Sequence, residues 1–378
     1  MKGRWSIAAL GVVLTGVLVW AIAFRDDGTR PRNETRADSR TRPENGSSPD
    51  IGATPENGAL PENGDLPKNE DLKPVGAGLY WVGGPQASFP FIDHAIISTE
   101  WENLEPRDDD FSGAGWDLID ESLDDYPDYE FRLRIAMGQR APDWVKSLDG
   151  GCLGITHPES GERACVPRFW TDAYLDEYEE LMAEIARRYD DEPQIRDVVN
   201  SACMTIYAEP FIRAGNDEGS NHRLWEAGLS EETYRYCLER STHDMAKVFE
   251  HTRVSLATHL QWQIVVADGV DPSWEKERVL LEALRRELGQ QLVIQNNGLG
   301  GDDGCESDEA EMWCWLAELS PPKGAQTEGD TKLELDGFTV HDAIDQALEL
   351  GACFVEHNQF GDDASLARAA DDQLKANC

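Results

Sequence analysis

Residues 198–210 read Val-Val-Asn-Ser-Ala-Cys-Met-Thr-Ile-Tyr-Ala-Glu-Pro, and this stretch decides the fold. It is almost continuously apolar as far as residue 208, which is the pattern of a strand covered on both faces in a parallel sheet. The run is followed directly by a carboxylate, Glu209. Because α/β barrels carry their reactive groups at the C-terminal ends of parallel strands, Glu209 is a candidate catalytic residue.

Similar apolar runs recur along residues 75–378 and alternate with helical patterns. The eight candidate strands span residues 78–82, 95–101, 130–136, 198–208, 253–258, 291–295, 324–327 and 352–355. Apolar residues spaced three and four apart predict helices over residues 171–189, 275–288 and 341–350. Repeated strand–helix units indicate a parallel sheet, and eight strands favour a closed (β/α)8 TIM barrel of the α/β class in one domain.

A second carboxylate ends another of these strands. Residues 323–329 read Lys-Gly-Ala-Gln-Thr-Glu-Gly, which places Glu328 at the tip of the seventh predicted strand. Two carboxyl groups that face each other supply the acid and the nucleophile that glycoside cleavage needs. Glu356 ends the eighth predicted strand and is the alternative nucleophile. The simpler interpretation of Glu209 is an ion pair with Arg213 or a turn.

Residues after the other predicted strands extend this candidate site. The candidates for substrate binding are Trp81, Trp101, Arg140, Trp144, Tyr207, His259, Asn296 and Glu356. Indole rings stack on the apolar faces of sugars, while amides and carboxylates bind hydroxyl groups, so this mixture predicts a carbohydrate ligand. Taken singly, each tryptophan also fits core packing, and Arg140 also fits a structural ion pair.

The N-terminal residues predict an exported protein. Lys2 and Arg4 precede an uncharged stretch over residues 5–24, so residues 1–25 are either a membrane anchor or a cleaved signal peptide. Residues 26–74 repeat Pro-Glu-Asn-Gly and contain too few large apolar residues to form a core, which predicts a disordered linker. The folded domain therefore begins near residue 75 and lies outside the cytoplasm.

Charge and cysteine usage narrow the function further. The net charge of −39 argues against nucleic acid as a partner, because a polyanion would be repelled. Eight cysteines in an exported chain predict disulfides, and the pairs expected from proximity are Cys152–Cys165 and Cys305–Cys314. Cys203 lies inside an apolar run and is expected to be a buried free thiol.

Several other enzyme classes are not indicated. His259 and His357 lack the partners of a zinc motif, so we expect no catalytic metal. The sequence contains no G-x-S-x-G elbow, which argues against a serine hydrolase. No Rossmann or P-loop glycine pattern opens a helix, so no nucleotide cofactor is expected.

Four motifs carry a resemblance to a known family: Trp101-Glu-Asn-Leu-Glu-Pro106, Trp116-Asp-Leu-Ile-Asp120, Ala141-Pro-Asp-Trp144 and Ala208-Glu-Pro210. They resemble the retaining (β/α)8-barrel glycoside hydrolases of clan A, and most of all its β-galactosidase-like members. In that clan the acid/base glutamate ends the fourth strand and the nucleophile ends the seventh, which implies these roles for Glu209 and Glu328. One departure is Ala208, because the clan has asparagine before the acid/base.

The resemblance implies hydrolysis of an oligo- or polysaccharide by double displacement, with no cofactor. Ala208 favours an alternative, a non-catalytic cell-surface protein that binds carbohydrate on the same barrel. A structural envelope protein is a third hypothesis. Membrane contact is expected only through the N-terminal segment, and the oligomeric state is not predicted.

Overall fold

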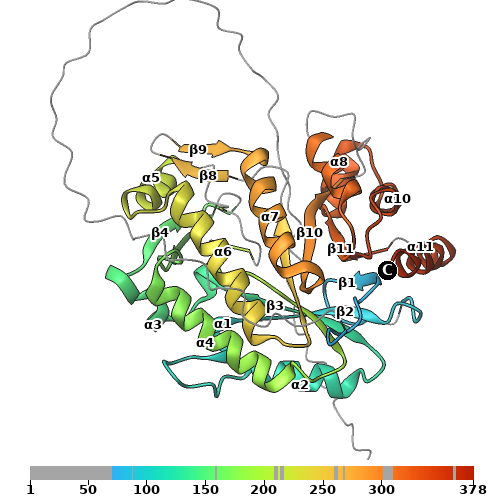
Figure 1. Ribbon diagram of the computed structural model, residues 1–378, viewed down its shortest axis with the longest axis horizontal. Helices are drawn as coiled ribbons and strands as arrows, with labels where there is room; N and C mark the ends of the chain where they lie inside the picture. Colours follow the sequence, from blue (N-terminus) through green and yellow to red (C-terminus); the bar gives the residue numbers. More distant parts are fainter. Residues whose placement is uncertain are drawn as a thin grey trace, which may run out of the picture.

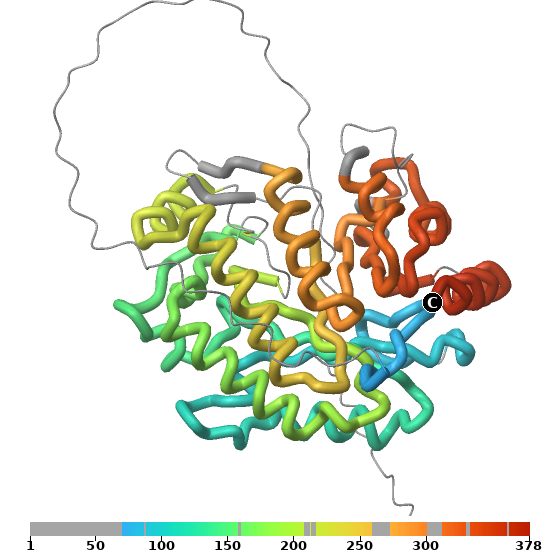
Figure 2. Tube along the Cα trace, in the orientation of Figure 1, coloured from blue at the N-terminus to red at the C-terminus, as the bar shows by residue number. Residues whose placement is uncertain are grey.

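The computed structural model describes residues 70–86, 88–157, 160–207, 212, 217–258, 263–266, 269–300, 310–360 and 363–378; the side chains of 263–266, 269–272, 310–311 and 330–332 are not described. Its centre is a closed barrel in the order β1-β12-β11-β10-β7-β6-β3-β2, in which all neighbouring strands are parallel. Figures 1 and 2 show the course of the chain, coloured from blue near the N-terminus to red at the C-terminus. The predicted (β/α)8 TIM barrel is confirmed. The barrel strands are β1 (Gly78–Trp81), β2 (His94–Glu100), β3 (Glu130–Ala136), β6 (Ile195–Val199), β7 (Arg253–Thr258), β10 (Leu292–Leu299), β11 (Lys323–Thr327) and β12 (Phe354–His357).

Helices cover the outside of the barrel, and α4, α6 and α7 run side by side over one flank (Figure 1). The predicted helices over 171–189, 275–288 and 341–350 are confirmed to within a residue as α4, α7 and α10. The helices are α1 (Trp101–Leu104), α2 (Gly115–Asp125), α3 (Asp143–Lys146), α4 (Asp172–Tyr189), α5 (Glu218–Glu226), α6 (Glu231–Val248), α7 (Trp274–Leu288), α8 (Ala310–Glu318), α9 (Asp330–Asp336), α10 (Val340–Glu349) and α11 (Ala364–Ala376). Two hairpins extend loops that follow barrel strands: β4 (Leu153–Thr156) with β5 (Arg163–Val166), and β8 (Gln263–Val266) with β9 (Gly269–Pro272).

The connection from β1 to β2 differs from the others, because its described residues contain no helix. Helix α11 packs on β1 instead. The Asp371 carboxylate accepts a hydrogen bond from the Leu79 backbone N–H at 2.9 Å, and Lys375 forms ion pairs with both Asp371 and Asp93. The first strand is therefore held by a helix from the far end of the described chain.

Two cores stabilise the molecule. The larger lies between the barrel and its helices and includes Trp101, Tyr174 and Leu280. The smaller lies inside the barrel and is formed by Tyr80, Ile96, Val293, Cys353 and Phe354. Burial of this much apolar surface is the main favourable term in folding.

The predicted fourth strand is wrong beyond Val199, where β6 ends. Residues 200–206 are buried but form no strand. Their polar groups are satisfied by other parts of the fold: the Tyr174 hydroxyl donates to the Ala202 carbonyl at 2.9 Å, and the Gln139 N–H donates to the Thr205 carbonyl at 3.0 Å. An apolar run alone does not distinguish a strand from buried irregular chain.

The cysteine predictions have mixed outcomes. The Cys152–Cys165 disulfide is confirmed and links β4 to β5. The prediction that Cys203 is a free thiol is wrong, since it is bonded to Cys237 of α6. A third disulfide joins Cys353 to Cys378. Cys314 is also disulfide-bonded, while Cys305 lies outside the described residues.

The predicted anchor, residues 1–25, and residues 26–69 of the predicted linker 26–74 lie outside the described part of the chain. Residues 70–74 of that linker are described, and Leu72 among them is buried. Within that part, none of the helices combines the length and the apolar character needed to cross a bilayer. Three disulfides between described cysteines are typical of proteins that fold outside the cytoplasm.

Candidate active site

The barrel interior contains a buried network of charges below its C-terminal end. On β3, Arg132 pairs with Asp197 of β6 at 2.8 Å and with Glu356 of β12. Arg134, two residues further along β3, pairs with Glu356 and donates to the Gln326 side chain at 3.1 Å. Because β3 and β12 are separated by β2 and β1 in the sheet, these contacts cross the barrel interior. Two cations and two anions balance each other here.

This network forms the floor of an opening, which we call the mouth: the C-terminal end of the barrel with the loops that follow its strands. Ser98 of β2 is the ladder partner of Arg134 and belongs to the same inward-facing layer, yet it is exposed. Arg134 itself keeps 12% of its side chain accessible. The opening therefore reaches down to a layer of hydroxyl, amide and guanidinium groups.

Two carboxylates, Glu100 and Glu102, lie on the rim of the mouth at the end of β2. Glu100 keeps the inward direction of Ser98, two residues earlier, and pairs with Arg140 at 3.3 Å. Asn103 donates to the same carboxylate at 3.3 Å. Burial, and then a hydrogen bond with Glu100, raises the pKa of Glu102. Glu102 therefore takes up a proton more readily than a fully solvated glutamate.

Glu328 follows β11, the seventh strand of the barrel in chain order, as the sequence predicts. Its N–H donates to the Leu299 carbonyl at 2.9 Å, which continues the pairing with β10 past the end of the strand. Glu328 is two residues beyond the inward-facing Gln326, so it lies on the same face, one layer nearer solvent. It is half-buried. A half-buried carboxylate at a strand tip is well placed to meet a ligand in the mouth.

Glu356 lies deeper than Glu328. Its side chain is fully buried, and its two carboxylate oxygens contact Arg132 and Arg134. Gln295 of β10 also donates to it at 2.9 Å. Its contacts place Glu356 in the floor network rather than on the rim.

Two aromatic candidates lie partly exposed in loops that follow barrel strands. Trp144 of α3 is half-buried and donates to the Glu105 carbonyl at 3.3 Å. Tyr207 is half-buried, and its ring packs edge-on against His157 of the β4–β5 loop. Both rings keep an accessible part that can contact a ligand.

Three further candidates are buried. Trp81 is 1% exposed; its ring stacks on Phe89 and belongs to the core between the barrel and its helices. Trp101 is fully buried, where it donates to the Glu105 carboxylate at 2.9 Å. Asn296 is 1% exposed, and its amide contacts Met312 of α8. The structure thus brings Arg140, Trp144, Tyr207 and Glu328 to loops at the mouth and places these three in the surrounding packing.

Glu105 lies beneath this rim. Burial raises its pKa to about 7, although hydrogen bonds from Trp101 and the Asp109 N–H act in the opposite direction. Its carboxyl group therefore changes charge near neutral pH while fixing the loop that follows β2.

Two candidates fall outside the described residues: Glu209, with the preceding Ala208, and His259. The separation between the carboxyl groups of Glu209 and Glu328, which distinguishes retention from inversion, is therefore not among the described distances.

Sequence reasoning missed the floor residues Ser98, Arg134 and Gln326. A signal for Arg134 was present, since Glu130–Ala136 alternates Arg132 and Arg134 with the apolar Phe131, Leu133 and Ile135. Inside a barrel, that alternation puts both guanidinium groups in the interior. A surface strand would show the same pattern, so only the closed sheet separates the two cases.

Comparisons with known proteins give likenesses of fold. The chain matches no family model and no curated protein sequence. Among solved structures, endo-glycoceramidase II from Rhodococcus sp. is 13% identical, with 78% of this chain and 75% of that chain covered and a TM-score of 0.46. The catalytic domain of β-amylase from Paenibacillus polymyxa is 11% identical over 76% and 94% of the chains, with a TM-score of 0.47. An endo-1,4-β-xylanase from Caldicellulosiruptor owensensis is 10% identical over 74% and 84%, with a TM-score of 0.40.

These structural neighbours are glycoside hydrolases by name. At 10–13% identity and TM-scores of 0.40–0.47, what these names say of substrates belongs to those proteins.

Proposed function

We propose that the protein is a retaining glycoside hydrolase that cleaves a glycosidic bond in an oligo- or polysaccharide. The observation that carries the proposal is the place of Glu328, which is half-buried and directly follows the seventh barrel strand. The segment that leads to Glu209 follows β6, the fourth strand. In the barrel order β6 and β11 are separated by β7 and β10, so groups at their ends approach a ligand from different sides.

In this mechanism Glu209 and Glu328 have different roles. Glu209, protonated, gives its proton to the leaving oxygen while the ionised Glu328 attacks the anomeric carbon. A water molecule, deprotonated by Glu209, then hydrolyses the glycosyl ester and frees Glu328. Two carboxyl groups about 5 Å apart do not ionise together easily, which keeps the proton on one of them.

The remaining candidates divide by position. Arg140, Trp144, Tyr207 and His259 follow barrel strands and contact the substrate in this proposal. Trp81, Trp101, Asn296 and Glu356 are buried. In this proposal they do not contact the substrate but hold the strand ends and loops in position. A neutral polar floor suits an uncharged sugar, because hydroxyl groups both donate to carboxylates and accept from guanidinium groups.

The proposal includes export. Disulfides between described cysteines fit an oxidising compartment, and residues 1–25 are proposed to act as anchor or signal, with residues 26–74 as linker. A soluble form that begins near residue 70 is therefore suitable for assays, since the described fold begins there.

The second candidate function is carbohydrate binding without turnover. Ala208, where the resembling family has asparagine, favours it. Asn200, the first amide after β6, does not replace that asparagine, since it is fully buried and donates to both Ser241 and Thr242 of α6.

Turnover of chromogenic β-glycosides by the wild type and by Glu328→Gln tests the proposal. We expect Glu328→Gln to lower kcat by more than about a thousandfold, because removal of a nucleophile abolishes the covalent step. Glu334→Gln on α9, an exposed glutamate six residues away, is the matched control and should keep full activity. Proton NMR of the first-formed sugar should show the anomer of the substrate.

Unchanged turnover in Glu328→Gln would remove Glu328 as the nucleophile. A first product with the opposite anomeric configuration would replace retention by inversion. Saturable binding of an oligosaccharide by calorimetry, with no turnover of any substrate, would establish the second candidate function instead.

A further inference from the structure

The segment 200–207 follows the fourth barrel strand and ends two residues before Glu209. Its first seven residues are buried, although none of them belongs to a helix or strand. Buried irregular chain needs specific partners for its backbone groups, and these partners hold it in one conformation. Here they come from three separate parts of the fold.

The loop after β3 provides the first set of contacts. The Gln139 N–H donates to the Thr205 carbonyl at 3.0 Å. Gly138 has a φ of +52°, and a Cβ atom on it would lie 2.5 Å from the Thr205 carbonyl oxygen and 2.7 Å from that of Met204. Only glycine combines this backbone conformation with so close an approach. The two loops are therefore packed backbone against backbone.

Helix α6 provides the second set. The Asn200 amide donates to Ser241 and Thr242, at 2.9 Å in each case. Three residues later, Cys203 is joined to Cys237 of the same helix by a disulfide. Both cysteine side chains are fully buried. The Asn200 hydrogen bonds and the Cys203–Cys237 disulfide thus fix this segment to a single helix.

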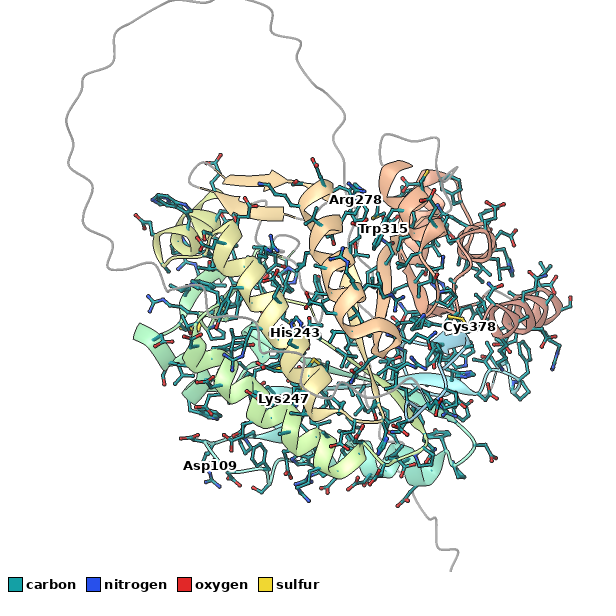
Figure 3. All side chains as sticks on the ribbon, viewed as in Figure 1. Asp109, His243, Lys247, Arg278, Trp315 and Cys378 are labelled. Carbon is teal, nitrogen blue, oxygen red and sulfur yellow. A yellow bond between two sulfur atoms is a disulfide. The ribbon has the colours of Figure 1, made fainter. Side chains whose placement is uncertain are left out.

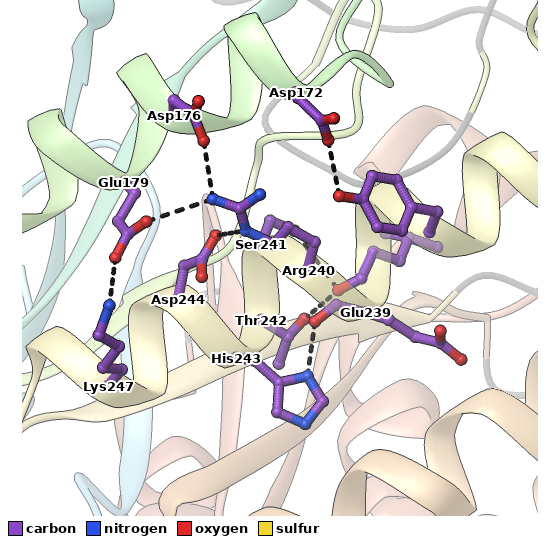
Figure 4. Close-up of polar contacts among 12 residues, drawn as sticks. Asp172, Asp176, Glu179, Glu239, Arg240, Ser241, Thr242, His243, Asp244 and Lys247 are labelled. Atoms are coloured by element: carbon purple, nitrogen blue, oxygen red, sulfur yellow. Dashed lines mark hydrogen bonds and ion pairs between the residues drawn. The ribbon is translucent and has the colours of Figure 1, made fainter. Parts of the chain in front are cut away.

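Helix α6 is itself held in place by ion pairs with α4. Arg240 forms ion pairs with Asp176 and Glu179 of α4, at 2.9 and 3.3 Å (Figure 4). Lys247, which lies further along α6, also forms an ion pair with Glu179, at 2.7 Å (Figure 4). Tyr174 of α4 also donates to the Ala202 carbonyl, so both helices hold the segment directly.

We propose that the Cys203–Cys237 disulfide and the Asn200 amide are positioning groups for the reaction: they fix segment 200–207, and through it the acid/base Glu209. This inference rests on the proposed glycosidase function. No helix or strand lies between Val199, where β6 ends, and Tyr207, so regular structure does not set the position of this segment. The ties to α6 replace the sheet in that task, and a displacement of about 1 Å in a catalytic group can cost a hundredfold in rate.

The test compares two double variants. Cys203→Ser/Cys237→Ser removes the proposed positioning tie, and Cys353→Ser/Cys378→Ser removes a disulfide at the opposite end of the barrel; Cys378 is labelled beside α11 in Figure 3. The two disulfides span 34 and 25 residues, so their loss frees unfolded chains of similar length. We expect the first variant to lose about tenfold or more in kcat with KM changed less than about twofold. The second should keep the wild-type kcat.

A milder variant covers the case in which Cys203→Ser/Cys237→Ser does not fold. Thr242→Val leaves the disulfide in place and removes one acceptor of the Asn200 amide. It should lower kcat in the same direction by a smaller factor. It should also shift the alkaline limb of the pH–rate profile, since that limb reports the protonated acid/base.

Hydrogen exchange supplies a readout that does not need activity. Amides of residues 200–207 should exchange at least about tenfold faster in Cys203→Ser/Cys237→Ser than in the wild type, while those of β12 should not change. Unchanged exchange in residues 200–207, or a kcat equal to that of the Cys353→Ser/Cys378→Ser variant, would overturn the inference. A wild type without turnover overturns the proposed function, and exchange then still decides whether the disulfide holds the segment.

Discussion

Replacement of Glu356 by glutamine is the sharpest probe of the barrel floor. The side chain is fully buried, with Arg132 and Arg134 on its two oxygens and the Gln295 amide at 2.9 Å. Glutamine keeps the size of the side chain and removes its charge. It also turns an NH2 group toward a guanidinium, where a donor faces a donor.

The expected loss of stability in Glu356→Gln follows from the number of charges in the floor. The wild-type floor holds Arg132 and Arg134 against Asp197 and Glu356, whereas Glu356→Gln leaves two cations with one anion. Removal of one partner from a buried ion pair costs about 3–5 kcal/mol. Each kcal/mol shifts the Tm of a large domain by about 2–4 °C, so the Tm should fall by roughly 6–20 °C.

Thermal unfolding followed by circular dichroism measures this shift. The double variant Arg134→Met/Glu356→Gln restores the charge balance and keeps the Arg132–Asp197 pair, so it should be more stable than Glu356→Gln alone. A Tm for Glu356→Gln within about 2 °C of the wild type, or a double variant less stable than the single one, would refute this account of the floor.

Two further predictions concern pH and salt. His94 lies between Asp93 and Glu130, at 2.8 and 3.2 Å. Burial lowers the pKa of His94, but the favourable interactions with both carboxylates outweigh burial, and the net pKa is raised. Its stabilising effect is therefore complete below pH 6.5 and is lost as the pH rises through the folded-state pKa, so the Tm difference between wild type and His94→Gln should shrink over that range; parallel Tm curves would contradict this. With a net charge of −39, the protein should gain Tm as NaCl rises from 0.01 to 1 M, since the Debye length falls from about 30 to about 3 Å; differential scanning calorimetry that shows no rise would exclude charge repulsion as a destabilising term.

The strand count was predictable because each barrel strand is a short apolar run followed by a change of pattern. That count put Glu328 at the end of the seventh strand, where the structure places it. The end of the fourth strand was not predictable, because the apolar run continues beyond Val199. Its later residues are buried by loops and helices instead of by sheet neighbours, and composition does not separate these two environments.

Long-range pairing explains the other differences. The Cys152–Cys165 bond closes a hairpin and follows from local sequence, whereas the partner of Cys203 depends on how α6 packs. The same holds for Arg132, whose partners lie on β6, β7 and β12. A charged residue in a strand is expected to face solvent, and only the closed barrel supplies enough counter-charges to bury it.

The arrangement around β1 has a consequence for how the protein is made. This strand pairs with β12 on one side, and its outer face is covered by α11 rather than by a helix that follows it in the chain. During synthesis, residues 78–81 are made long before residues 354–376, with which they pack in the closed barrel. Until those residues are made, unpaired strand edges can form wrong pairings. Closure of the barrel therefore requires nearly all of the described chain, because β1 completes its pairing only when β12 is present.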